Sequence, residues 1–433
     1  MHGTSHLRTI DPPGSPTGRS ASDAAVLPET HVEVRPSNAA REASQLLEAF
    51  ALRTGLDGPS AHARRYVWTD ACAVMAWIHL HAQSGIARDL ARAQKLVEQV
   101  HATLARHRFD DGRTGSLSKL SDAEAALRPT AGGLRIGKPL PERRPEEPYN
   151  EHLEWDRDGQ YFHYNIRWML ALEALARATG DARHLRAAIE LAVRCVEAFA
   201  HGGGIRGGER LYWKMSIDLS RPLVSSMGHH DALDGLVTLE RLRASAGPLG
   251  LDASPLEIPI GRLRAMCADG TSWVTGDPLG LGGLLGDISL AVRLSVEEMG
   301  PRDPTLERVV VDMLVDAQRG LAAFDAEQAF HGDSRDRLAF RELGLASGLR
   351  RCAGLAQLVR GNPGRLGSAA MTGAIVEKLA AIERRMPIAT RLEDSWRGAL
   401  AQATASWQAH RDINEVMLAE ALALRGVPPD ELE

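Results

Sequence analysis

The sequence predicts an all-α protein built from paired helices. Apolar residues recur at i, i+3, i+4 and i+7 from Ala39 to the end of the chain, and no segment keeps the alternation that marks a half-buried strand. The connections between the expected helices alternate in length. The turns Ser84-Gly85 and Thr179-Gly180-Asp181 are tight, whereas the long connections span 108–159, 201–229 and 269–281. We therefore expect short and long loops at opposite ends of the fold.

Glycine and proline positions divide this pattern into about twelve helices. The expected ranges are 39–54, 63–83, 89–107, 160–179, 182–200, 230–245, 255–268, 282–299, 304–324, 335–360, 367–385 and 410–425, with a further helix considered at 392–406. Residues 1–37 hold five prolines among Ser, Thr and Gly, which predicts a flexible N-terminal arm. The remaining residues, 38–433, are expected to form a single domain.

Two of the tight turns repeat each other. The segments that begin at Gly85 and Gly180 share Gly, Ala, Arg and Leu at matching positions, which indicates a repeated helical hairpin. Pairing the helices in sequence from 63–83/89–107 gives five hairpins and leaves the helices at 39–54 and 410–425 without partners. If these two pack together, they complete a ring of six hairpins.

This pattern resembles the six-hairpin (α/α)6 toroid shared by many glycoside hydrolases, polysaccharide-processing enzymes and N-acylglucosamine 2-epimerase-like isomerases. The resemblance covers about 39–425 and concerns the fold. It implies that the inner helices point their N-termini into a funnel, built by the long loops, where the substrate binds. In this sequence the long loops precede the helices at 63, 160, 230, 282, 335 and 410, which are therefore expected to be the inner ones.

Composition restricts the partners and the location. The chain has 433 residues with a net charge of -5 and a pI near 6.4, so no overall charge favours nucleic acid or an anionic membrane. We expect no membrane helix, because no apolar run approaches the roughly 20 residues required, and we find no apolar stretch typical of a signal peptide. The protein is expected to be cytoplasmic. The four cysteines are far apart and are expected to be thiols in the core.

The densest polar segment lies at the start of the expected helix 160–179. It contains Glu154, Trp155, Asp156, Arg157, Asp158, Tyr161, His163, Tyr164 and Arg167. Capping of this helix needs no more than one or two carboxylates. Capping does not account for the whole group, so we predict that Asp156 and Asp158 are candidate catalytic acids and that Trp155, Tyr161, His163 and Arg167 bind substrate.

The next helix start carries His229, His230, Asp231 and Asp234. Asp231 is a candidate catalytic acid, with capping as the alternative, and His229 and His230 are candidate sugar-binding or acid–base groups. His230 and Asp234 lie one turn apart, and with His163 they could bind a metal. No metal-binding motif accompanies them, so no metal or other cofactor is predicted.

Asp70 and Asp287 each interrupt an apolar run. Burial would raise the pKa of such a carboxyl and suit it to act as a general acid, whereas a neighbouring Arg would lower the pKa and make the residue structural. Four tryptophans near the expected funnel are candidates for stacking on sugar rings, namely Trp68, Trp155, Trp213 and Trp273, whereas Trp77 and Trp168 are expected in the core. His410 and Glu415 complete the predicted set of binding residues. We expect Asp70, Asp158, His163, His230, Asp231 and Asp287 to line one cavity.

Together these residues predict a carbohydrate-active enzyme that hydrolyses a glycosidic bond in a small-molecule or oligosaccharide substrate. Such chemistry needs one protonated and one ionised carboxyl group across the funnel. Two alternatives remain open. The same fold could isomerise or epimerise a sugar with His as the acid and base. The funnel could also bind a carbohydrate without catalysis, if its carboxylates are neutralised by Arg157, Arg167 or Arg341.

Overall fold

The computed structural model describes residues 37–58, 63–202, 208–267, 271–297, 304–324 and 330–427. The expected N-terminal arm lies outside these residues, apart from Ser37. The side chain of Ser37 accepts a hydrogen bond from the backbone N–H of Ala40 and thereby caps the first helix. Residues 36–433 form one unit by their contacts, and this unit is mostly helical, as the sequence predicts.

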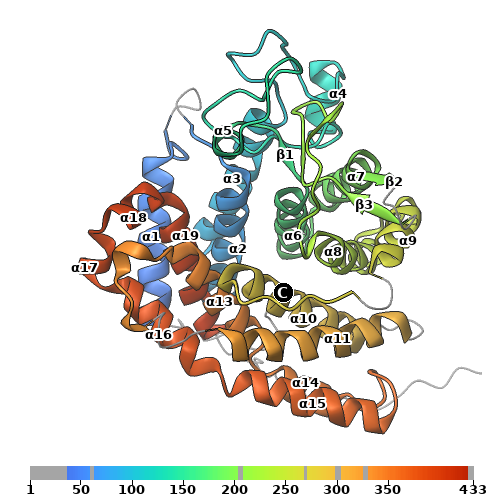
Figure 1. Cartoon of the computed structure of the whole chain (residues 1–433), viewed down its shortest axis with the longest axis vertical. Coiled ribbons are helices and arrows are strands. Elements are labelled where there is room, and N and C mark those ends of the chain that lie inside the picture. The colour runs from blue at the N-terminus through green and yellow to red at the C-terminus, as the bar shows by residue number, and fades with distance from the viewer. Residues whose placement is uncertain are drawn as a thin grey trace, which may run out of the picture. The chain divides into compact units, whose positions relative to one another are not determined.

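Six helices contact one another in a closed order, each touching the next and the last touching the first (Figure 1). In that order they are α2 (Val67–Ser84), α6 (Phe162–Thr179), α8 (Asp231–Ala246), α10 (Pro278–Glu297), α13 (Ala339–Arg351) and α19 (Arg411–Ala423). We call them the inner helices. They are buried on almost all faces, so their side chains can meet at a common centre.

A second helix packs against each inner helix from outside this order. These partners, following the same order, are α3 (Ala87–Leu104), α7 (Ala182–Phe199), α9 (Glu257–Met266), α11 (Pro304–Ala323), α16 (Met386–Arg397) and α1 (Asn38–Arg53). The first helix thus packs against the last, as predicted. The repeated turns are also confirmed, because Gly85 and Gly180 both end their helices in the left-handed conformation, with φ of 67° and 69°.

The expected fifth hairpin is wrong. The helix predicted at 335–360 breaks after Cys352, where Gly354 takes a φ of 77°, and continues as α14 (Leu355–Gly361). The following helix, α15 (Ala369–Glu383), packs on α14 and α11, whereas α13 pairs with α16. The short helices α17 (Ala399–Gln402) and α18 (Ala405–Ala409) then lead to α19.

The long connections also hold structure that the sequence did not predict. Two helices lie in 108–159, namely α4 (Asp122–Leu127) and α5 (Glu151–Asp156). Two small antiparallel sheets follow. One has the order β1 (Gln160–Tyr161), β4 (Lys214–Met215) and β5 (Pro222–Val224), and the other pairs β2 (Ala200–Gly202) with β3 (Glu209–Leu211). Strands of two or three residues are too short to show an alternating pattern.

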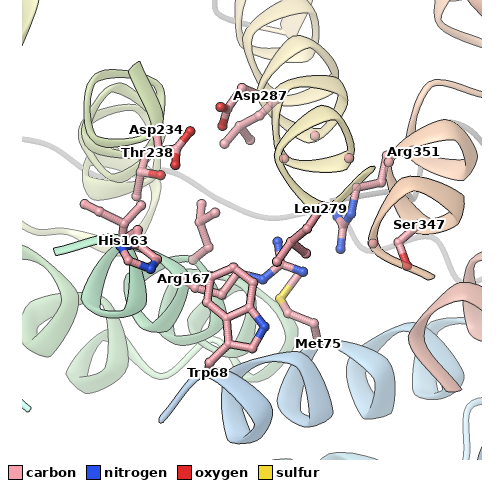
Figure 2. Close-up of a pocket in the computed structure, with 18 of the residues that line it drawn as sticks. Trp68, Met75, His163, Arg167, Asp234, Thr238, Leu279, Asp287, Ser347 and Arg351 are labelled. Carbon is pink, nitrogen blue, oxygen red and sulfur yellow. The ribbon is translucent and has the colours of Figure 1, made fainter. Parts of the chain in front are cut away.

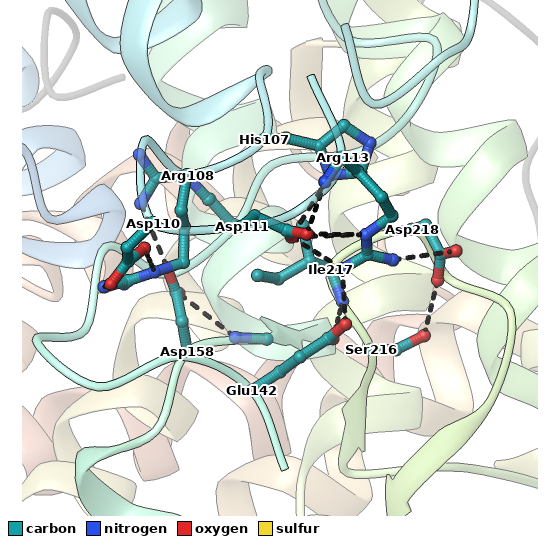
Figure 3. Close-up of polar contacts among 12 residues, drawn as sticks. His107, Arg108, Asp110, Asp111, Arg113, Glu142, Asp158, Ser216, Ile217 and Asp218 are labelled. Atoms are coloured by element: carbon teal, nitrogen blue, oxygen red, sulfur yellow. Dashed lines mark hydrogen bonds and ion pairs between the residues drawn. The ribbon is translucent and has the colours of Figure 1, made fainter. Parts of the chain in front are cut away.

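An ion-pair network fastens these long connections to each other (Figure 3). Arg113 contacts Asp111 at 2.8 Å, Glu142 at 2.6 Å and Asp218 at 3.1 Å. Glu142 also accepts a hydrogen bond from the backbone N–H of Ile217, at 2.6 Å. The connection before α6 is therefore held to the one before α8 at the N-terminal ends of the inner helices.

The helix α10 is apolar enough that Pro278–Val296 could span a membrane by length and composition alone, contrary to the expectation that the chain holds no such stretch. In the structure 72% of this stretch is buried. A Cβ at Gly282 would lie 2.2 Å from the carbonyl oxygen of Gly344, and one at Gly348 would lie 2.4 Å from that of Gly282. The apolar, glycine-rich composition is therefore explained by close packing of α10 on α13.

Candidate functional site

A cavity of about 110 Å³ lies among the inner helices, and all six of them contribute to its lining (Figure 2). Apolar side chains and glycines make up most of the wall. The polar side chains among the lining residues are those of His163, Arg167, Glu173, Asp234, Thr238, Asp287, Ser347 and Arg351. Concave, mostly apolar sites with a few converging polar groups are typical of ligand-binding pockets.

The carboxyl groups of Asp234, on α8, and Asp287, on α10, form a hydrogen bond beside this cavity. They point toward each other in Figure 2. Burial and the adjacent Asp287 raise the pKa of Asp234 well above its ordinary value. Two carboxylates in contact cannot both be ionised at low cost, so this contact favours a proton shared by the pair.

A third acid, Asp231, lies one helical turn before Asp234. Burial raises the pKa of Asp231 to about 7, and the charge of Asp234 adds to this shift. Its carboxylate accepts a hydrogen bond from the backbone N–H of Gly228 and lies 3.7 Å from Nδ1 of His163. Burial lowers the pKa of His163 to about 4, so this imidazole is neutral at neutral pH. Asp231 and His163 therefore form a carboxyl–imidazole couple, and His163 reaches the cavity.

Two guanidinium groups also belong to the wall. Arg167 and Arg351 both contact the same oxygen of Glu420, at 2.6 and 2.8 Å. Although burial opposes the shift, these two charges lower the pKa of Glu420. The Arg167 guanidinium also lies 6.0 Å from the ring centre of Trp68, another lining residue.

Several buried polar atoms at the cavity have no hydrogen-bond partner within the described residues. They include Asp234 Oδ1, Thr238 Oγ1 and Ser347 Oγ. Buried polar atoms in native proteins are nearly always hydrogen-bonded, to protein, water or ligand. The cavity is therefore suited to an occupant with several hydroxyl groups.

Glycines leave the space for this occupant. A Cβ at Gly283 would meet nothing within 4 Å, and one at Gly286 would meet only the side chain of Arg351, at 3.8 Å. Both glycines line the cavity. Neither takes the positive φ that would mark a glycine required by a turn. They therefore set the width of the site.

Of the predicted site residues, Trp68, His163, Arg167 and Asp287 line this cavity. Asp231 lies directly behind His163. Sequence reasoning missed Asp234 as an acid, together with Glu173, Thr238, Ser347 and Arg351. The spacing of Asp231 and Asp234 on one helix face could have indicated the first of these, whereas the others lie too far from the helix starts.

Three other predicted acids and Glu415 do not line the cavity. Asp70 contacts Arg65 at 3.2 Å; burial raises its pKa to about 6, against the effect of the Arg65 charge. Asp158 is fully buried between Arg108, at 3.2 Å, and Arg135, at 3.0 Å. Asp156 is exposed at the end of α5.

Glu415 pairs with Arg53 and Arg411. The expectation that Asp70, Asp158 and His230 share one cavity with Asp287 is wrong.

The predicted aromatic residues fall into two groups. Tyr161, Trp155 and Trp213 belong to one cluster of ring contacts that reaches His163. The others lie elsewhere. His230 is buried, and its Nε2 lies 2.9 Å from the carbonyl oxygen of Trp273. His229 is exposed, and its ring contacts the ring of His230. Trp273 is buried, and His410 is exposed and packs on Phe340.

Among the described residues no three His, Cys, Asp or Glu side chains are arranged to hold a metal ion. The four cysteines are buried thiols, as the sequence predicts.

No known protein family and no curated protein matches this chain. Its function must therefore be inferred from the geometry of the cavity.

Proposed function

We propose that this protein is a carbohydrate-active enzyme that cleaves a glycosidic bond in the central cavity, on an (α/α)6 toroid whose inner barrel is formed by the six inner helices. The closed order of their contacts supports the toroid. The position of the cavity among all six of them supports a substrate site of the kind that this fold implies. The observation that carries the proposal is the contact between the buried carboxyl groups of Asp234 and Asp287 at the cavity wall.

The pair supplies the acid. A proton shared by two carboxyls beside a cavity can be donated to the oxygen of a departing sugar. Glycosidase carboxyls stand about 5–5.5 Å apart in retaining enzymes and about 6.5–9.5 Å apart in inverting ones. Asp234 and Asp287 are in hydrogen-bond contact, which is closer than either arrangement. We therefore assign the two carboxyls to one role, as a shared acid.

The base is then His163 with Asp231 behind it. A neutral imidazole accepts a proton from water, and a carboxylate at its other side stabilises the imidazolium that forms. The geometry fits this role, since His163 lines the cavity and Asp231 lies 3.7 Å from its Nδ1. Hydrolysis with inversion follows if the imidazole activates water on the face opposite the acid.

The same couple favours a second function. Isomerisation or epimerisation of a sugar needs a group that removes a proton from carbon and returns one, and a neutral His with a carboxyl acid nearby is suited to both steps. The two functions differ in outcome, because only hydrolysis releases a new reducing end.

Binding without catalysis is less well supported. That alternative requires the site acids to be neutralised by Arg157, Arg167 or Arg341. These arginines instead contact Glu147, Glu420 and Asp277. Asp234 and Asp231 have no Lys or Arg ion pair within the described part of the chain.

The test is a screen of the purified protein with aryl glycosides, oligosaccharides and free sugars, followed by chromatography and a reducing-end assay. We expect new reducing ends with at least one glycoside. Asp287→Asn and Asp234→Asn should abolish this activity, while Asp122→Asn, an exposed control outside the cavity, should retain it. Conversion of a free sugar without bond cleavage would instead favour the isomerase. No turnover of any substrate in the panel would oppose both enzymatic functions.

A further inference from the structure

The cavity is small, and its wall is closed where α10 meets α13. Its volume is about 110 Å³. Between α10 and α13 there is no space even for a Cβ at Gly282 or Gly348. A longer substrate must therefore extend out of the cavity on a side other than the contact between α10 and α13. The side chains of His163 and Arg167 are each 23% exposed, which makes the α6 side of the cavity accessible.

A continuous series of aromatic contacts begins on this side and ends at the surface. The ring of His163 is stacked parallel to that of Trp213, with the ring planes 14° apart and the centres 6.2 Å apart. Trp213 contacts Trp155 edge to face at 5.1 Å. Trp213 is half-buried and Trp155 is 50% exposed. Tyr161 packs on both Trp213 and His163 and fixes their positions.

We propose that Trp213 and Trp155 form sugar-binding subsites outside the cavity, and that the substrate is an oligosaccharide whose terminal unit occupies the cavity. This inference rests on the proposed function and names its substrate class. Indole faces pack on the apolar C–H surface of sugar rings, and a half-exposed Trp155 continuous with the cavity presents such a face to the second and third units.

Polar groups flank this aromatic surface. Asp156 follows Trp155 directly and is exposed. Its charge acts on Lys138, whose ammonium lies 5.5 Å from the ring centre of Tyr66. Tyr66 in turn shares a 2.9 Å hydrogen bond with Tyr164, a neighbour of His163. Carboxylate, ammonium and hydroxyl groups beside an aromatic surface are suited to bind the hydroxyls of a sugar chain.

The experiment measures binding directly, so that it does not depend on turnover. Full-length protein is titrated calorimetrically with gluco-, xylo-, chito- and galacturono-oligosaccharides of one to four units. At least one series is expected to bind more tightly as it lengthens from one unit to three. Trp155→Ala should weaken binding of the trisaccharide about tenfold and leave binding of the monosaccharide unchanged.

Leu153→Ala is the matched control, since Leu153 lies on the same helix, is 44% exposed and takes no part in the aromatic contacts. It should bind as the wild type does, and Trp155→Tyr should retain most of the affinity. Three results would overturn the proposal. The monosaccharide and the trisaccharide could bind equally well, Trp155→Ala and Leu153→Ala could lose the same affinity, or no oligosaccharide series could bind. Length-dependent binding without turnover would instead retain the subsites and remove the enzymatic function.

Discussion

Two groups of acids in this protein are both largely buried but differ in what surrounds them. In the network of the long connections, arginine side chains contact Asp111, Asp218 and Asp158. At the cavity, Asp234 contacts another carboxyl, and Asp231 contacts an imidazole. The difference shows that burial alone does not identify a catalytic acid, because the neighbouring charge decides whether the proton is lost or kept.

The pKa shifts of Asp218 and Asp231 run in opposite directions. Burial opposes the shift of Asp218, yet hydrogen bonds from Ser220 and Ser216 and the charge of Arg113 lower its pKa to about 2. Burial raises the pKa of Asp231 to about 7, and no arginine counteracts it. The first acid is suited to hold the long connections in place, and the second to exchange protons near neutrality.

The largest effect on stability is expected at Asp158. Replacing it with Ala leaves Arg108 and Arg135 buried without their shared carboxylate, which should cost about 3–5 kcal/mol of unfolding free energy. Urea unfolding measures the loss. Asp156→Ala, at an exposed neighbouring position, should change stability by less than about 0.5 kcal/mol. Equal effects in the two variants would contradict the structural role of Asp158.

Asp287→Asn should have the opposite profile, with a large effect on turnover and a small one on folding. The Asn amide can donate a hydrogen bond to Asp234, so the contact is kept while the shared proton is lost. We expect activity to fall about 10²- to 10⁴-fold with no loss of stability at neutral pH. Kinetics and urea unfolding of the same preparation check this. A variant that is destabilised but still active would show that the Asp234–Asp287 pair has a structural role and no catalytic one.

The pH dependence of stability separates the two groups further. In the native protein Asp231 keeps its proton up to about pH 7, whereas in the unfolded chain it loses the proton near the ordinary aspartate pKa of 3.8. The native state therefore binds more protons between these values, and this residue's contribution to stability falls as pH rises from about 4 to 7. His163 acts oppositely, since its pKa is lowered from 6.5 to about 4.

Asp231→Asn removes the contribution to stability that falls as pH rises from about 4 to 7. Relative to the wild type, this variant should therefore become more stable as pH rises through that window. Urea unfolding of both proteins at several pH values measures the difference. A wild-type-minus-variant difference that stays constant with pH would mean that Asp231 is ionised throughout.

The smallest effect is expected at the glycines of the cavity wall. Gly283→Ala and Gly261→Ala both place a Cβ in open space on a helix, and each should stabilise the fold by about 0.5–1 kcal/mol. Only Gly283 lines the cavity, so only its variant should weaken ligand binding or slow turnover. Thermal unfolding and calorimetry with the same two proteins test both parts. If binding weakens equally in both variants, the cavity is not the site.

The sequence predicted the helices well, because burial of one face leaves a periodic apolar pattern and burial of all faces leaves a long apolar run, and each helix carries these signals by itself. Asp287 was recognised for a related reason, as a carboxyl within an apolar run. Asp158 was misassigned because its partners, Arg108 and Arg135, lie on the preceding long connection. Asp234 was missed because its role depends on contact with Asp287, from a different helix. Pairings of this kind depend on tertiary structure and leave no local pattern.

The most direct test of the shared proton is a pH titration of aspartate carboxyl carbons by ¹³C NMR in the wild type and in Asp287→Asn. We predict that the wild type has a carboxyl with a pKa raised well above the ordinary aspartate value. This pKa should fall in the variant, since burial still raises the pKa of Asp234 but the Asp287 carboxyl no longer adds to it. Titration of every aspartate below about pH 5, or identical curves for the two proteins, would contradict this prediction.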